Sequence, residues 1–163
     1  MNYKAKNSAK INSEINNKSA AKTNETDSQS DIKQAVVKFN EDLYFIKKLV
    51  FSTGDYFEEN TIITITFYAD KMTVKKEDLY QIKYVEDEII VNKETRDNFI
   101  RKLQNLHLGE WKSRYDNLSV LDGTRWSLDL YFSNEQPTIH FDGSNAYPSN
   151  FDEFCRLINL LAD

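Results

Sequence analysis

A stretch near the end of the chain alternates apolar and polar side chains with a period of two. The apolar positions are Trp126, Leu128, Leu130 and Phe132, and the polar positions between them are Arg125, Ser127, Asp129 and Tyr131. This alternation predicts a half-buried β-strand, because successive side chains of a strand point to opposite faces of the sheet. The Asp122-Gly123 dipeptide just before the strand predicts a turn. The chain must therefore form a sheet with one buried face and one polar face.

The next apolar segment continues the pattern. Ile139 and Phe141 are expected to point into the core. Thr138, His140 and Asp142 alternate with them and are expected on the polar face. The two strands together predict a hairpin with one aromatic side and one hydrophilic side.

An amphipathic helix is expected at the C-terminal end, after a predicted loop over residues 143–148. Ser149 or Asn150 is the predicted N-cap, and Asp152 or Glu153 is the predicted partner in a capping box. The expected buried stripe is Phe151, Phe154, Cys155, Ile158 and Leu161.

Two further helices are predicted from apolar residues at helical spacing. The first covers residues 31–43, with Ser30 or Asp31 as the N-cap. The second covers residues 93–108 and is expected to end at Gly109. Their apolar positions are Ile32, Ala35, Val36, Phe39 and Leu43 in the first, and Phe99, Ile100, Leu103, Leu106 and His107 in the second. Trp111 and Tyr115 are expected to pack the corner after the second helix onto the sheet.

The remaining segments predict strands that are rich in aromatic and β-branched residues. Residues 44–52 form one, with Phe45, Leu49 and Phe51 on one face, and residues 53–55 and 58–60 form a turn and loop after it. Residues 61–68 form the next, with Ile63, Ile65 and Phe67 inward, followed by a turn and a strand over residues 72–75. Residues 79–85 and 89–91 are expected to form a hairpin about the turn Glu86-Asp87-Glu88.

These elements indicate an α+β fold in which an antiparallel sheet packs against two or three helices. Residues 1–30 are polar, and we expect them to form a disordered arm. Residues 31–163 are expected to form a single domain, which carries sixteen basic and twenty-three acidic residues, a net charge of −7. An acidic domain repels nucleic acid, so no direct nucleic-acid binding is expected. It is better suited to a basic protein surface.

The compartment follows from what the sequence lacks. Its single cysteine, Cys155, cannot form an intrachain disulfide. No segment has the apolar core of a leader peptide or the length of a membrane helix. We therefore expect a cytoplasmic protein that does not bind a membrane.

The residues that could carry chemistry do not form a convincing set. Cys155, His140 and Asp142 could be assembled as a thiol triad, but Cys155 lies on an apolar helix stripe where a thiol is inert. Asp122, Asp129 and Asp142 could approach a hard cation, but carboxylates are common on a solvated sheet face. No glycine-rich phosphate loop is present. We therefore expect a protein without catalytic activity, bound metal or cofactor.

Recognition of another protein remains as the expected function. Tyrosine and arginine are frequent at the centre of interfaces, and acidic turns suit a basic partner. The alternative is an ordinary solvated face with ordinary turns. The candidate partner-binding residues are Arg125, Asp129, Tyr131, His140 and Asp142 on the polar face, and Glu58, Glu59, Glu86, Asp87 and Glu88 in the acidic segments.

Three motifs carry a resemblance over residues 95–163. They are Trp111-x3-Tyr115, then Leu121-Asp122-Gly123-Thr124-x-Trp126-Ser127-Leu128, then Gly143-Ser144-Asn145-Ala146-Tyr147-Pro148-x-Asn150-Phe151. This segment resembles a C-terminal module in proteins of low-GC Gram-positive bacteria and their mobile elements, and no activity comes with the module. In size, acidity and lack of a catalytic set, the chain also resembles phage-borne anti-CRISPR proteins. That resemblance implies an inhibitor of a host type II effector nuclease. The alternative is a toxin-immunity or regulatory binding protein.

Overall fold

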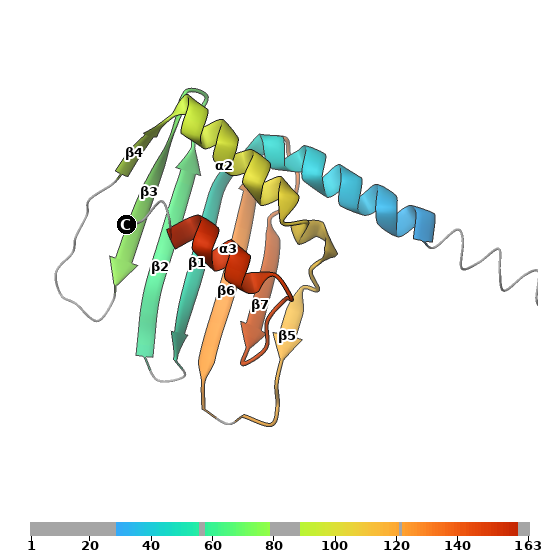
Figure 1. Cartoon of the computed structure of the whole chain (residues 1–163), viewed down its shortest axis with the longest axis vertical. Coiled ribbons are helices and arrows are strands. Elements are labelled where there is room, and N and C mark those ends of the chain that lie inside the picture. The colour runs from blue at the N-terminus through green and yellow to red at the C-terminus, as the bar shows by residue number, and fades with distance from the viewer. Residues whose placement is uncertain (1–28, 56–57, 79–88, 121, 160–163) are drawn as a thin grey trace, which may run out of the picture. The chain divides into compact units, whose positions relative to one another are not determined.

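The computed structural model describes residues 29–55, 58–78, 89–120 and 122–159, with residues 58–60 described by their backbone alone (Figure 1). Residues 29–42 form a helix, which belongs partly to a first unit, Met1–Lys38, and partly to a second, Phe39–Asp163. The other elements all lie in the second unit. They are η1 (Leu43–Phe45), β1 (Ile46–Asp55), β2 (Glu58–Phe67), β3 (Lys71–Asp78), β4 (Ile89–Asn92), α2 (Lys93–Asn105), η2 (Leu108–Glu110), β5 (Arg114–Asp116), β6 (Thr124–Phe132), β7 (Ile139–Ser144) and α3 (Phe151–Asn159).

The strands form one mixed sheet in the order β4-β3-β2-β1-β6-β7-β5. All neighbouring strands run antiparallel except β5, which pairs with β7 in parallel. The predicted α+β class is therefore confirmed. Strand β1 lies at the centre and pairs with both β2 and β6 over most of its length, so that two hairpins from different parts of the chain join there.

The buried face of the sheet follows from the strand register. Phe51 of β1 lies opposite Ile63 on β2 and Leu128 on β6. Leu49 of β1 lies opposite Leu130 on β6. All five side chains are buried. The period-two prediction for residues 124–132 is confirmed, because each apolar position of β6 is buried and the polar positions between them are not. Ile63, Ile65 and Phe67 of β2 are likewise buried as predicted.

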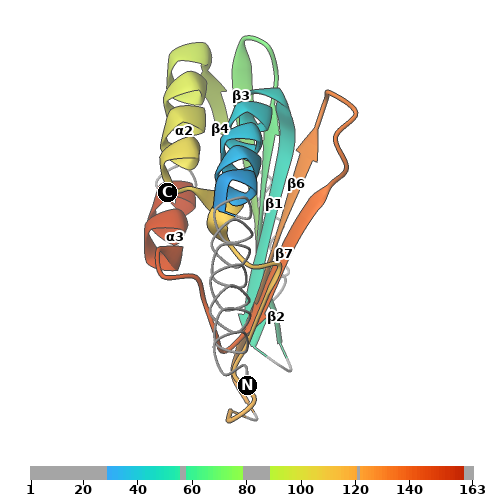
Figure 2. The ribbon, with the colours of Figure 1, turned by 90° about the vertical axis from the view of Figure 1, so that its right-hand side faces the viewer.

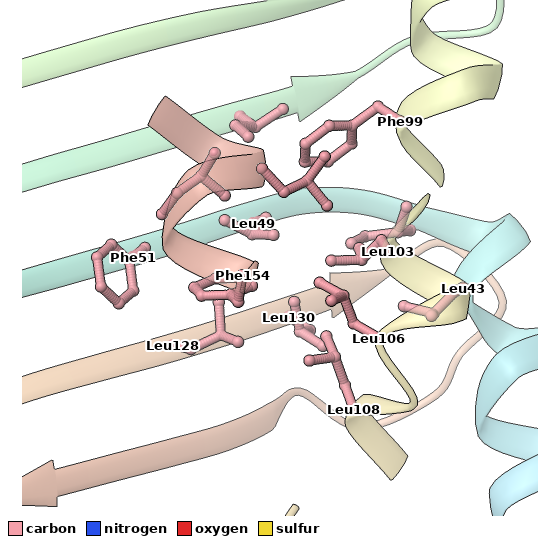
Figure 3. Close-up of a cluster of buried hydrophobic side chains, with 14 of the residues drawn as sticks. Leu43, Leu49, Phe51, Phe99, Leu103, Leu106, Leu108, Leu128, Leu130 and Phe154 are labelled. Atoms are coloured by element: carbon pink, nitrogen blue, oxygen red, sulfur yellow. The ribbon is translucent and has the colours of Figure 1, made fainter. Parts of the chain in front are cut away.

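Helices α2 and α3 cover that buried face from one side (Figure 2). Figure 3 shows Leu103 of α2 and Phe154 of α3 in one cluster with Leu49, Leu128 and Leu130 of the sheet. Leu103 and Phe154 are both fully buried. Burying a leucine or phenylalanine side chain contributes about 1.5–3 kcal/mol, so this layer supplies much of the stability of the fold.

The end of α2 differs from the prediction. The helix ends at Asn105, and His107 adopts a left-handed backbone conformation with φ of 50°. Gly109, the predicted stop, lies instead in η2. His107 is exposed and does not join the packed side of the helix. The cause is tertiary, because the early end lets the fully buried Leu108 turn back toward the core.

The N-terminal helix is confirmed, but its predicted cap is wrong. The described helix already includes residue 29, so Ser30 and Asp31 lie within it and neither is the N-cap. The first and last predicted apolar positions differ in burial. Ile32 in the helix is 63% exposed, whereas Leu43, which lies just after the helix in η1, is fully buried. Both residues were predicted as apolar helix positions from their spacing alone, and that spacing does not report how deeply each one is buried.

The start and end of β1 also correct the prediction. Tyr44 and Phe45 lie in the η1 turn, and Phe45 is 49% exposed, so it does not share a face with Leu49. The predicted turn over residues 53–55 is part of the strand, because Gly54 pairs with Arg125 and Asp55 with Thr124. Pairing to β6 therefore overrides the turn tendency of the Gly-Asp sequence.

The edge of the sheet beyond β3 agrees with the prediction only in part. The strand predicted over residues 89–91 is confirmed as β4, but its described partner is β3, with Ile89 opposite Val74, and not the predicted residues 79–85. The predicted strand over residues 79–85, the acidic turn 86–88, most of the predicted arm and Leu161 lie outside the described residues. Residues 29 and 30, predicted as the end of the arm, are helical.

Candidate functional site

Residues of the three sequence motifs contact one another at one corner of the fold. The indole Nε1 of Trp126 donates a hydrogen bond to the carbonyl of Ala146 at 2.9 Å. The amide of Asn145, whose φ is 53°, donates to the carbonyl of Thr124 at 3.0 Å. A methyl group at Gly143 would lie 2.3 Å from Trp126 Nε1, so only glycine allows the indole to lie this close to the strand. These three positions of the motifs therefore have structural roles.

Asn150 connects the same corner to helix α2. Its side-chain oxygen accepts a hydrogen bond from Trp111 Nε1 at 2.8 Å, and its side-chain nitrogen donates to the carbonyl of Leu106 at 2.6 Å. The backbone carbonyl of Asn150 accepts from the amides of Glu153 and Phe154, which begin α3. Asn150 thus stands directly before α3, as predicted for the N-cap, but its side chain forms hydrogen bonds that join this position to the chain after α2.

Trp111 is the centre of an aromatic cluster at this corner. Its ring lies between 5.5 and 6.2 Å, centroid to centroid, from the rings of Trp126, Phe141, Phe151 and Phe154. Three of these contacts are edge-to-face, a favoured geometry for aromatic pairs. The prediction that Trp111 packs this corner onto the sheet is confirmed, since only 9% of the residue is exposed.

The other side of the sheet, which we call the open face, bears the predicted polar residues. Asp129 on β6 contacts His140 on β7, with Oδ1 and Nδ1 2.7 Å apart. The other ring nitrogen of His140 lies 3.8 Å from Asp142. Arg114 on β5 lies 3.1 Å from Asp142 and pairs with Asp116 at 2.6 Å. These five residues form a continuous cluster, which we call the charged cluster. The Asp116 carboxylate, which accepts hydrogen bonds from Arg114, raises the pKa of Arg114, and the charge of Asp142 raises it further.

The remaining predicted residues of the open face lie beside this cluster. The ammonium group of Lys48 lies 4.2 Å from the centre of the Tyr131 ring, a cation–π contact. Arg125 lies at the other end of β6, opposite Ser144 of β7. Between them the hydroxyls of Ser52 and Ser127 are 2.8 Å apart. The face thus combines charge, one aromatic ring and small hydroxyl side chains.

The sequence did not predict Arg114 and Asp116 as part of the site. They belong to β5, a three-residue strand too short to show a periodic pattern. The parallel pairing of β5 to β7, with Arg114 opposite Asp142, is what adds them to the cluster.

The acidic candidates cannot be placed in the same way. Glu58 and Glu59 lie in β2 rather than in the predicted loop, and their side chains are outside the described part. Glu86, Asp87 and Glu88 also lie outside it. The acidic segments therefore stay a prediction, and the open face is the candidate site that the structure assembles.

Cys155 and His140 lie on opposite sides of the sheet. Cys155 is on α3, which covers the buried face, whereas His140 belongs to the open face. Among the described side chains, no group of three His, Cys, Asp or Glu residues is arranged to hold a metal ion. In the same part of the chain, no helix is both long and apolar enough to cross a membrane.

A groove of about 510 Å³ lies beside α3 on the helical side of the sheet. Phe51 and Ile63 contribute apolar surface, whereas Lys76 and Asp152 contribute charge. Cys155 also lines it. Burial, with a smaller contribution from the nearby Asp152 carboxylate, raises the pKa of the Cys155 thiol to about 11.

We expect Cys155 to react slowly with iodoacetamide at pH 8. A pKa of about 11 instead of 9.0 lowers the thiolate fraction about 100-fold, and the greater nucleophilicity of a more basic thiolate offsets this by about tenfold. Mass spectrometry should show alkylation about tenfold slower in the folded protein than in urea. Equal alkylation rates in the two states would contradict this expectation.

The same pKa shift affects the stability of the fold. Because the folded state holds the thiol proton of Cys155 more tightly than the unfolded state does, the free energy of unfolding should fall as the pH rises from about 9 toward 11.

Comparison with known proteins adds no assignment. No family model, no curated protein and no solved structure matches this chain.

Proposed function

We propose that this protein is a non-enzymatic inhibitor that binds another protein through the open face of its sheet. Its target would be the type II RNA-guided nuclease of a bacterial host, and the protein would act by covering part of the surface that the nuclease needs. The observation that carries the proposal is the charged cluster of Asp129, His140, Asp142, Arg114 and Asp116, next to Tyr131 on the open face.

The geometry of this cluster suits binding to a protein. Arg114 is held between Asp116 and Asp142, so its guanidinium group already has a defined position. Ordering long side chains costs about 0.5–1.5 kcal/mol each on binding. A cluster that is ordered in the free protein avoids part of this cost. Tyr131 adds a rigid aromatic surface, and tyrosine and arginine are enriched among the residues that dominate binding energies.

The strands beneath these side chains make the surface rigid. Strand β6 is hydrogen-bonded to β1 on one side and β7 on the other. A partner that docks here therefore meets side chains fixed by a continuous sheet, and binding requires little change of the backbone.

The test is a DNA-cleavage assay with the type II nuclease of the same host. We expect saturating protein to suppress cleavage, and Arg114→Ala combined with Tyr131→Ala to weaken inhibition at least tenfold, since loss of a dominant contact costs about 2 kcal/mol or more. Lys102→Ala, on the exposed side of α2, is the matched control and should inhibit fully.

Full cleavage at saturating protein would exclude nuclease inhibition. The protein would then be tested against a toxin whose gene lies beside its own. Binding to that toxin that is lost in the same double variant would support the toxin-immunity alternative. Inhibition that the double variant retains would keep the inhibitory function but move the binding site away from the open face.

A further inference from the structure

The centre of the open face consists of small side chains at defined positions. Val50 lies on β1, with Thr64 opposite it on β2 and Asp129 opposite it on β6. One step along the strand, Ser52 lies opposite Ile62 and Ser127. All six residues are half-buried, although α2 and α3 both lie on the other side of the sheet. They form a low surface that another flat surface can approach.

The register extends these positions into two adjacent rows across the sheet. One row consists of Lys75, Thr64, Val50, Asp129 and His140. The neighbouring row consists of Glu77, Ile62, Ser52, Ser127 and Asp142. On β3, the basic Lys75 of the first row lies beside the carboxylate of Glu77 in the second row. On β7, His140 of the first row lies beside the carboxylate of Asp142 in the second row.

This arrangement is self-complementary about a two-fold axis. The two-fold axis runs between the two rows, parallel to the plane of the sheet and perpendicular to the strands. It places the first row of one copy over the neighbouring row of the second copy, and the reverse. Lys75 then faces Glu77 of the other copy, and His140 faces Asp142 of the other copy. Val50 faces Ser52, and Asp129 faces the hydroxyl of Ser127. A two-fold interface requires this reciprocity, in which residue i meets j and j meets i.

We propose that the open face binds a second copy of this chain, so that two sheets pack face to face in a symmetric dimer. Facing sheets in proteins lie about 10 Å apart with their strands at about −30°. Small central side chains allow this approach. Lys75 and Glu77 form a salt bridge of 3.0 Å within each copy. A second copy fits better than an unrelated occupant because one symmetry operation sets this pair against the same pair of the other copy with opposite charges facing, and sets His140 against the carboxylate of Asp142.

The size of the face limits the affinity. Across the sheet, the five neighbouring strands β3, β2, β1, β6 and β7 span about 24 Å at 4.8 Å per strand. Along the strands, a length of eight residues spans about 26 Å. Each copy therefore contributes on the order of 600 Å², and the pair on the order of 1,200 Å², at the lower end of specific interfaces. We expect a reversible dimer with a dissociation constant in the micromolar range, on the order of 10 μM.

The dimer does not depend on the proposed inhibitory function, since it is measured with the purified protein alone. If both are correct, a partner and a second copy compete for the same face. Inhibition per protomer should then be weaker at protein concentrations where the dimer predominates.

The experiment is sedimentation velocity combined with light scattering, on the full chain, between about 1 and 500 μM. We expect the mass to rise from 19.1 kDa to about twice that value. Thr64→Lys should keep the protein monomeric, because it places a charge at the centre of the interface and leaves the buried side of the sheet unchanged. Circular dichroism establishes that this variant is folded.

An exchange of charges tests the axis itself. Glu77→Lys should weaken the dimer at least tenfold, because the symmetry repeats the repulsion twice. Adding Lys75→Glu to that variant restores an opposite pair under the proposed axis and should recover the dimer. A 19.1 kDa species at every concentration would overturn the proposal, as would a dimer that Thr64→Lys leaves intact.

Discussion

Gly143→Ala is expected to lower the free energy of unfolding by about 3 kcal/mol. The added methyl would lie 2.3 and 2.5 Å from two atoms of the Trp126 indole and 2.7 Å from the carbonyl oxygen of Ala146. Overpacking of this kind costs about 1–3 kcal/mol. Moving the indole away also lengthens its hydrogen bond to Ala146, which contributes about another 1 kcal/mol. Urea unfolding followed by circular dichroism measures the sum.

Gly109→Ala is the matched control for this substitution. Its methyl would lie 3.1 Å from two atoms of the Phe39 side chain, a tight contact that a shift of a few tenths of an ångström relieves. We expect a loss below about 1 kcal/mol. Equal urea midpoints for the Gly143→Ala variant and the natural protein would show that the indole of Trp126 is not packed against this strand.

The core could be predicted from the sequence because it depends on local periodicity. Trp126, Leu128, Leu130 and Phe132 are buried because alternation in a strand is a property of the backbone itself. The same holds for the inward residues of β2. Where the chain changes from one element to the next, periodicity carries no information, and the predictions at Phe45, Gly54 and His107 were wrong for that reason.

The candidate site could be predicted only in part. Asp129, His140 and Asp142 share a face by alternation, and the structure brings them into contact. Arg114 and Asp116 joined them through a parallel pairing between distant segments, which no local pattern in the sequence reports. The two charge rows of the open face likewise depend on the register of β1 against β2 and β6, which is a tertiary property.

The three motifs of residues 111–151 were not assigned an activity from the sequence. In the structure, Gly143, Trp126, Asn145 and Asn150 of these motifs serve the packing of one corner. A short segment of unusual composition can thus reflect a demanding backbone geometry. Polar side chains in such a motif need a structure before a chemical role is assigned to them.

Trp111→Ala is expected to have the second large effect, a loss of about 4 kcal/mol. Replacing a buried tryptophan by alanine usually costs about 3–5 kcal/mol, because the surrounding groups close the cavity only in part. Here the removed ring contacts four other aromatic rings of the corner. Leu118→Ala, at a residue that is 91% exposed, should change stability by less than about 0.5 kcal/mol.

Trp111→Phe separates packing from hydrogen bonding at this position. It keeps an aromatic ring but removes the N–H group that donates to Asn150, and a buried acceptor left without its donor costs about 1–3 kcal/mol. Asn150→Ala should cost a similar amount alone, but less in the Trp111→Phe background, because residues that share a hydrogen bond are not additive. Additive losses would mean that Asn150 stabilises the corner only through the carbonyl of Leu106, and that the indole contributes through packing alone.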